Sequence, residues 1–263
     1  MPILQNTFRQ ILAAFSFFTR LPFWRITIVE KKHYERVVPW WPLVGWLTGG
    51  IMAIVYVIAS ACHLPIGVCV LLALVSRVLV TGALHEDGFA DFCDGFGGGT
   101  QRQRILEIMK DSHIGTYGVL GLVFYYLLLW NILIEVFSHH FSPLLFMATD
   151  TACKYFSSTI VYFLPYARSE AEAKNKLIYV RPSIMEQLVS LVFGLLPMTL
   201  LIIEEPQLAF CLIAPILCCL LLFTWMHRCI QGYTGDCCGA TFMITELMFY
   251  LSLCLILSQN YTL

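Results

Sequence analysis

Long apolar runs restrict the fold of this chain more than any other feature. A helix needs about twenty apolar residues to cross the hydrocarbon core of a bilayer. Segments near that length are residues 37–62, 64–84, 115–137, 142–164, 187–203, 208–230 and 240–258. The composition agrees, because 59% of the residues are hydrophobic and only 13% are charged. We therefore expect an all-α protein, a polytopic bundle of about seven transmembrane helices in a single domain, residues 1–263.

The first stretch of the chain differs from these runs. It carries Arg9 and Arg20 and lacks the small-residue cleavage site of a signal peptide. We expect an N-terminal amphipathic or re-entrant helix that lies at the membrane interface.

Charge and cysteine content exclude two classes of function. The net charge is −1, so no basic surface favours nucleic acid. Most of the 11 cysteines lie in apolar segments and none shows a C-x-x-C spacing. We interpret them as packing residues, without a disulfide or a structural zinc site.

Lysine and arginine lie on one side of the predicted topology. The connections at 62–65, 138–142 and 204–207 and the C-terminal tail contain neither residue. The positive-inside rule assigns the basic side to the cytoplasm. The polar segments 85–114, 165–186 and 228–239 are therefore expected on the cytoplasmic face of the inner membrane.

The most distinctive polar segment is HEDGFADFCDGFGGG, residues 85–99. On a helix, Asp87, Asp91 and Asp94 fall within about 60° of one another. Carboxylates placed so closely repel unless a cation lies between them, and Mg²⁺ binds one or two carboxylates together with substrate phosphates. The spacing predicts a metal-bound phosphate substrate, with Asp111 as a further ligand.

Glycines and basic residues follow these acids. Gly95 and the glycines at 97–99 allow close approach of a ligand, and Thr100 is expected to cap a following helix. Arg102 and Arg104 would then contact phosphate oxygens near the helix N-terminus. The alternative is a solvated acidic connection, the more common role of such a loop.

Ionisable residues are also expected inside the membrane, where they are costly and often functional. Arg77, Glu246 and Lys154 lie in the half of the bilayer nearest the acidic segment. Lys154 and Asp150, four residues apart, either pair with each other or contact substrate. The segment GYTGDCCGA, residues 232–240, again combines glycines with an acid and opens the helix that carries Glu246.

Four ordered segments resemble the adenosylcobinamide-GDP ribazoletransferases, also called cobalamin synthases. They are PLVGWLTGG (42–50), HEDGFADFCDG (85–95), LEIMKDSHIGTYG (106–118) and GYTGDCCGA with the downstream Glu246. The resemblance covers essentially the whole chain. It implies an integral enzyme of the inner membrane that uses Mg²⁺. It also implies transfer of the adenosylcobinamide phosphate of adenosylcobinamide-GDP to the ribose 3′-hydroxyl of α-ribazole or its 5′-phosphate, with release of GMP.

Residue chemistry and the resemblance together predict the site. The predicted catalytic residues are His85, Asp91 and Asp94, and His85 or a nearby acid would accept the hydroxyl proton. The predicted Mg²⁺ ligands are Asp87, Asp91, Asp94 and Asp111. The predicted substrate contacts are Glu86, Gly98, Arg102, Arg104, Ser112, Thr234, Asp236 and Glu246. The chain departs from the family where Cys153 and Lys154 replace a Ser-Arg pair and His113 replaces an arginine.

Two other functions fit parts of the pattern. A CDP-alcohol phosphotransferase also has spaced aspartates, but it requires an Ala-Arg pair where Phe89 and Ala90 follow Gly88. A cation transporter has buried acids near the bilayer midplane in repeated helices, whereas these acids gather at one surface. The sequence does not fix the oligomeric state, and a homo-oligomer is among the expected partners.

Overall fold

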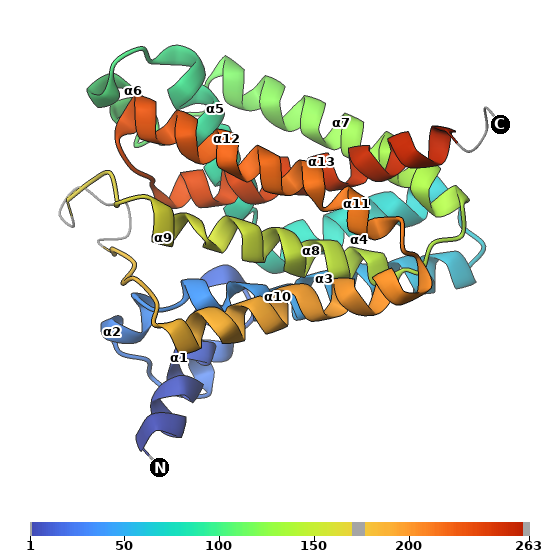
Figure 1. The fold of residues 1–263 in the computed structure, drawn as a ribbon, viewed down its shortest axis with the longest axis horizontal. Coiled ribbons are helices and arrows are strands. Elements are labelled where there is room, and N and C mark those ends of the chain that lie inside the picture. The colour runs from blue at the N-terminus through green and yellow to red at the C-terminus, as the bar shows by residue number, and fades with distance from the viewer. Residues whose placement is uncertain (1, 170–176, 260–263) are drawn as a thin grey trace.

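The computed structural model describes residues 2–169 and 177–259, and these residues form helices with no β-strand. The long helices run side by side in one bundle, with the N-terminal helix at one end (Figure 1). The long or site-forming helices are α1 (Pro2–Phe18), α3 (Trp41–Ala61), α4 (Ile66–Thr81), α5 (Leu84–Gly98), α6 (Arg102–Ile108), α7 (Thr116–Ser138), α8 (Leu144–Ser158), α10 (Ile184–Glu204), α12 (Ile213–Ile230) and α13 (Gly235–Gln259). The all-α membrane bundle is confirmed.

Short helices connect these elements. They are the 3₁₀ turns η1 (Phe23–Arg25) and η2 (Val38–Trp40) and the α-helices α2 (Lys31–Tyr34), α9 (Ile160–Phe163) and α11 (Leu208–Cys211). The N-terminal helix predicted from the sequence is α1, and its interfacial position stays a prediction.

The described residues contain fewer helices that qualify as membrane spans by length and composition than the predicted seven. Five described helical segments are long and apolar enough to cross a bilayer: Val38–Ala61, Thr116–Ser138, Ile184–Glu204, Leu208–Ile230 and Gly235–Gln259. Counting α4 with α5 as one bent span gives six. The predicted span 142–164 is divided between α8 and α9 at Thr159, and α8 has only 15 residues. Its polar side chains are buried by neighbouring helices, so α8 is an interior element.

A sharp bend between α4 and α5 places the acidic segment. The two helix axes differ by 89°, and Gly82 and Ala83 between them have φ of +65° and +59°. Glycine adopts this left-handed conformation without a steric penalty, and the Arg20 side chain occupies the space where a Cβ of Gly82 would lie. The bend turns α5 across the end of the bundle, which is visible in Figure 1.

Helix α8 lies in the interior, packed against α3, α10 and α13. Gly45 and Gly49 of α3 face it, and a Cβ on Gly45 would lie 3.0 Å from the Thr151 Cα. Small residues four apart allow two helices to approach this closely in a membrane. The approach puts the buried Asp150 and Lys154 in the centre of the bundle.

Candidate functional site

A pocket of about 220 Å³ lies at the end of the bundle where α3, α5 and α13 begin. The C-terminus of α1 and the residues Tyr166, Arg168, Leu177 and Tyr179 complete its wall. Its lining residues are Phe17, Phe18, Val38, Trp41, Leu84, His85, Asp87, Gly88, Tyr166, Arg168, Leu177, Tyr179, Gly235, Asp236, Cys238 and Gly239. The pocket therefore joins the HEDG and GYTGDCCGA segments, which the sequence separates by about 150 residues.

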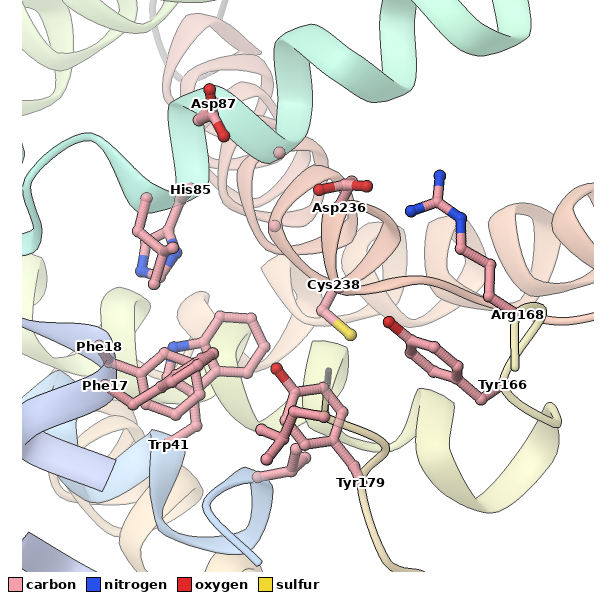
Figure 2. Close-up of a pocket in the computed structure, with 16 residues that line it drawn as sticks. Phe17, Phe18, Trp41, His85, Asp87, Tyr166, Arg168, Tyr179, Asp236 and Cys238 are labelled. Atoms are coloured by element: carbon pink, nitrogen blue, oxygen red, sulfur yellow. The ribbon is translucent and has the colours of Figure 1, made fainter. Parts of the chain in front are cut away.

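Two glycines allow α5 and α13 to meet. A Cβ on Gly88 would lie 3.1 Å from the Asp236 Cα, and one on Gly239 would lie 3.1 Å from the His85 carbonyl oxygen. A larger residue at either position would separate the helices. This contact brings Asp87 and Asp236 to the same pocket (Figure 2).

Backbone hydrogen bonds place the third charged group, Arg168. The Ala167 N–H donates to the Tyr233 carbonyl at 2.8 Å, and the Tyr233 N–H donates to the Pro165 carbonyl at 2.9 Å. Arg168 is 8% exposed, and its guanidinium donates to the Leu106 carbonyl at 2.8 Å. The guanidinium is thereby held at the pocket that Asp236 also lines, and Figure 2 draws both side chains on the same side of it.

We call Asp87, Asp236 and Arg168 the rim of the pocket. Asp87 is exposed and Asp236 is 8% exposed. A guanidinium suits phosphate because its donors form a planar fork, and carboxylates suit a hard cation. Arg168, which lies in the polar segment 165–186, was not among the residues selected from the sequence. No motif or spacing marks it.

The predicted three-acid face of α5 does not form one site. Asp91 is 9% exposed and is not among the residues that line the pocket. The Asp94 carboxylate accepts hydrogen bonds from the Gly115 N–H at 2.6 Å and the Gly118 N–H at 2.8 Å. These donors are at the N-terminus of α7, where a carboxylate is stabilising. Asp94 thus has a structural partner that the sequence did not indicate.

Asp111 and Ser112 lie on an exposed turn, and neither lines the pocket. The Asp111 carboxylate accepts from the His113 backbone N–H at 3.0 Å and lies 2.7 Å from the His113 Nδ1. The hydrogen bond with the His113 side chain lowers the pKa of Asp111 from its usual 3.8. The structure does not bring Asp111 together with Asp87 or Asp91.

The predicted phosphate contacts of the next segment also have other partners. Arg102 donates to the Ile230 carbonyl at 3.0 Å and to the Ala167 carbonyl at 2.7 Å. Arg104 pairs on the surface with Glu107 at 3.7 Å. Arg102 therefore clamps the two chain segments that carry Arg168 and Asp236, and supports the pocket from outside.

Gly97 and Gly99 pack closely against neighbouring side chains, and Gly98 is exposed. A Cβ on Gly97 would collide with the Tyr117 ring, one on Gly99 would lie 2.7 Å from an Ile105 side-chain carbon, and one on Gly98 would touch Ile108 at 3.5 Å. The expectation that these glycines approach a ligand is not supported by this arrangement. Thr100 is not the cap of α6, because Gln101 holds that position without a side-chain hydrogen bond.

Two predicted substrate residues, Thr234 and Glu86, have hydrogen-bond partners within the protein. The Thr234 hydroxyl accepts from the Cys237 N–H at 3.4 Å and donates to the Asp236 carboxylate at 3.3 Å. Glu86 is 5% exposed and accepts from the Tyr126 hydroxyl at 2.7 Å. Thr234 therefore orients Asp236, whereas Glu86 points into the bundle.

Glu246 belongs to a second group of charges, deeper in the bundle. Its carboxylate pairs with Arg77 and accepts from the Tyr125 hydroxyl. Lys154 pairs with Asp150 at 2.5 Å and donates to the Thr48 hydroxyl at 2.7 Å. We call Arg77, Asp150, Lys154 and Glu246 the buried cluster. Each member is at most 1% exposed, and the predicted pairing of Asp150 with Lys154 is confirmed.

His85 lies between the pocket and the buried cluster. Its ring is 5.4 Å from the Trp41 ring and 4.9 Å from the Phe242 ring. Phe242 in turn lies 5.3 Å from the Arg77 guanidinium and 4.9 Å from the Lys154 ammonium. The His85 Nε2 is buried and has no hydrogen-bond partner among the described residues. A buried ring nitrogen without a partner, on a residue that lines a cavity, is a candidate for a hydrogen bond with a ligand.

The donor set of the pocket allows a restricted kind of metal site. Within residues 2–169 and 177–259, no group of three or more His, Cys, Asp or Glu side chains lies close enough together to bind a metal ion. Two carboxylates at the rim suffice for Mg²⁺, which typically takes one or two from protein and fills its shell with phosphate oxygens and water. The rim therefore fits a cation that arrives with a phosphate ligand.

A tyrosine next to the rim stays neutral. Burial, together with the negative charge of Asp236, raises the pKa of Tyr166 to about 12. Its hydroxyl therefore remains a hydrogen-bond donor at physiological pH.

Comparison with known proteins agrees with the motifs. The family described as cobalamin-5-phosphate synthase matches residues 10–254. The adenosylcobinamide-GDP ribazoletransferase of Leptospira interrogans is 33% identical over 259 residues, covering 95% of this chain and 96% of that protein. The protein of the same name from Shewanella amazonensis is 35% identical over 262 residues, covering 99% of this chain and 100% of the relative. No solved structure matches the chain.

Proposed function

The chain belongs to the cobalamin-5-phosphate synthase family, and we propose that its pocket is the site of that reaction. The chain transfers the adenosylcobinamide phosphate of adenosylcobinamide-GDP to the ribose 3′-hydroxyl of α-ribazole or its 5′-phosphate, and GMP leaves. The observation that carries the proposal is the meeting of Asp87, Asp236 and Arg168 at one pocket. The family match favours this reaction over CDP-alcohol phosphotransfer and over cation transport.

The rim provides what phosphoryl transfer requires. The ribose oxygen forms a bond to the phosphorus of the cobinamide phosphate, and the bond from that phosphorus to the GMP oxygen breaks. Such reactions depend mainly on positioning and on neutralising charge. Arg168 binds phosphate oxygens from a guanidinium held by the Leu106 carbonyl, and a rim carboxylate accepts the hydroxyl proton.

Asp87 and Asp236 are also the residues that would hold Mg²⁺. When bound, the ion neutralises the charge of the diphosphate and of the departing GMP. Asp91, Asp94 and Asp111 lie outside the pocket lining, and Asp94 is engaged by α7. We therefore assign the metal to the two rim carboxylates instead of to a row of acids on α5.

The expected location of the site is the cytoplasmic face of the inner membrane. The pocket lies at the end of the bundle where Arg20, Arg102 and Arg168 are located. The positive-inside rule assigns that end to the cytoplasm. Both substrates would then enter from the cytoplasm.

The test is turnover by the purified full-length protein in detergent micelles. GMP release is followed with adenosylcobinamide-GDP and α-ribazole, with Mg²⁺ and again with excess EDTA. We expect turnover that depends on both substrates and is lost with EDTA. CDP-diacylglycerol with an alcohol acceptor is the control, and turnover of that pair alone would contradict the proposal.

A further inference from the structure

We propose that the pocket binds the nucleoside α-ribazole, with its benzimidazole base on the aromatic side of the pocket and its ribose at the rim. The inference rests on the proposed function, which supplies the identity of the two substrates. It adds which substrate occupies the pocket and which side chain recognises the base.

The size of the cavity selects the smaller substrate. A cavity of about 150 Å³ holds one benzene molecule, so about 220 Å³ accommodates a fused bicyclic base and part of a sugar. The corrin macrocycle, with its four linked five-membered rings and their side chains, is larger than this space. The cobinamide part of the other substrate must therefore lie outside the pocket, with its phosphate reaching the rim.

The shape of the wall suits a planar base. The rings of Phe18 and Trp41 stack at 5.1 Å with an angle of 8° between their planes. Phe17 and Tyr179 meet edge to face at 6.3 Å. These rings lie on one side of the pocket, away from Arg168 and Asp236 (Figure 2). A flat aromatic base packs well on such rings.

The polarity of the wall favours benzimidazole over guanine. Guanine carries hydrogen-bond donors and acceptors on its edges, and the apolar side of the pocket, with Val38, Leu84 and Leu177, would leave most of them unpaired. Unpaired polar atoms in an apolar environment are costly. The base of α-ribazole has a single free ring nitrogen, an acceptor, so it needs one donor only.

His85 is the side chain placed to supply that donor. It is 2% exposed and lines the pocket, and its ring orientation is held by Trp41 and Phe242. A neutral imidazole has one N–H donor, and an N–H of His85 can donate to the free ring nitrogen of the base. His85 thus acts as a specificity residue, and proton transfer is left to the rim carboxylates.

The experiment measures binding without turnover. Isothermal titration of the full-length protein in detergent micelles compares α-ribazole with an analogue in which indole replaces the benzimidazole and so lacks the free ring nitrogen. We expect α-ribazole to bind about tenfold more tightly, the effect of one buried hydrogen bond. His85→Leu should remove that difference, and His85→Gln, which keeps a donor, should restore part of it.

A second pair of variants tests the aromatic side. Phe17 is half-buried at the pocket, and Phe124 is exposed on α7. Phe17→Leu should weaken both ligands severalfold, because stacking does not depend on the ring nitrogen. Phe124→Leu is the matched control and should leave both affinities unchanged. Elution as a single folded species in size-exclusion chromatography qualifies each variant for the comparison.

Three results would overturn the inference. The first is equal affinity of the parent protein for α-ribazole and the indole analogue. The second is displacement of α-ribazole by GMP in simple competition. The third is that Phe17→Leu weakens the binding of GMP and leaves the affinity for α-ribazole unchanged. The last two would make the pocket a guanine site. Failure of the proposed function looks different, because the parent protein would then release no GMP from adenosylcobinamide-GDP whatever it binds.

Discussion

The rim and the buried cluster both consist of acidic and basic side chains, but they differ in the numbers of positive and negative charges. The buried cluster has two positive and two negative side chains that pair with each other, and all four are at most 1% exposed. The rim has two carboxylates and one guanidinium around a cavity, and Asp87 is exposed. The charges of the buried cluster pair inside the bundle, whereas the rim charges line a cavity that a ligand can enter. A charged residue in a membrane protein is therefore evidence for a functional site only after its interaction partners within the protein have been identified.

The largest effect is expected in the buried cluster. Glu246→Gln leaves Arg77 without its main counter-charge, and removal of one partner of a buried pair costs about 3–5 kcal/mol. We expect a markedly lower midpoint of thermal unfolding in detergent micelles.

The double variant Arg77→Met with Glu246→Leu is the control for that effect. Replacing both charges with apolar groups should recover most of the lost stability. If Glu246→Gln unfolds like the parent protein but raises the KM for a substrate, Glu246 contacts substrate, as the sequence predicted.

The next largest effect is expected at the rim, and it concerns rate. Asp87→Asn or Asp236→Asn should slow GMP release at saturating substrate by roughly two to three orders of magnitude, the usual cost of removing one charge-stabilising group. Asp87 is exposed, so its variant should unfold at the parent temperature.

Glu107→Gln supplies the matched control for the rim variants, because Glu107 is an exposed acid paired only on the surface. If Asp87→Asn releases GMP at a rate within a few-fold of the parent protein, Asp87 does not belong to the proposed metal site.

A smaller effect, and on stability, is expected for Asp94. Asp94→Asn weakens the acceptor for the Gly115 and Gly118 N–H groups at the start of α7. Hydrogen bonds to a charged group contribute about 1.5–3 kcal/mol, so unfolding should occur at a lower temperature. The folded fraction should release GMP at nearly the parent rate. A rate that falls by orders of magnitude while the unfolding temperature stays unchanged would return Asp94 to the predicted catalytic set.

The smallest effect is expected for Asp111. The hydrogen bond with His113 lowers the pKa of Asp111 in the folded protein below 3.8. Its contribution to stability is then present above the unfolded pKa and is lost as the pH falls through the folded value. An exposed surface pair such as this one contributes little to the free energy of unfolding. Because Asp111 also lies outside the pocket lining, Asp111→Asn should leave the rate of GMP release at pH 7 within about twofold of the parent rate. A large loss of Mg²⁺-dependent activity would instead support the predicted metal role.

The sequence by itself determined the helical bundle. Apolar length sets which segments cross a bilayer, and the predicted limits of the third span, 115–137, match α7 closely. The uneven distribution of Lys and Arg placed the polar segments at one end of the chain's topology, and the acidic motifs identified α5 and the start of α13. These properties are local, so they can be read from consecutive residues.

Contacts between segments that are distant in the sequence determined which acidic and basic side chains line the pocket and which have structural partners. Helical periodicity puts Asp87, Asp91 and Asp94 on neighbouring positions, but the bend at Gly82 and the approach of α7 decide that Asp87 reaches the pocket while Asp94 holds a helix end. Arg168 joins Asp236 only because the Tyr166 and Tyr233 segments pair. A side chain's chemistry depends on its neighbours, and in this bundle those neighbours come from helices far apart along the chain.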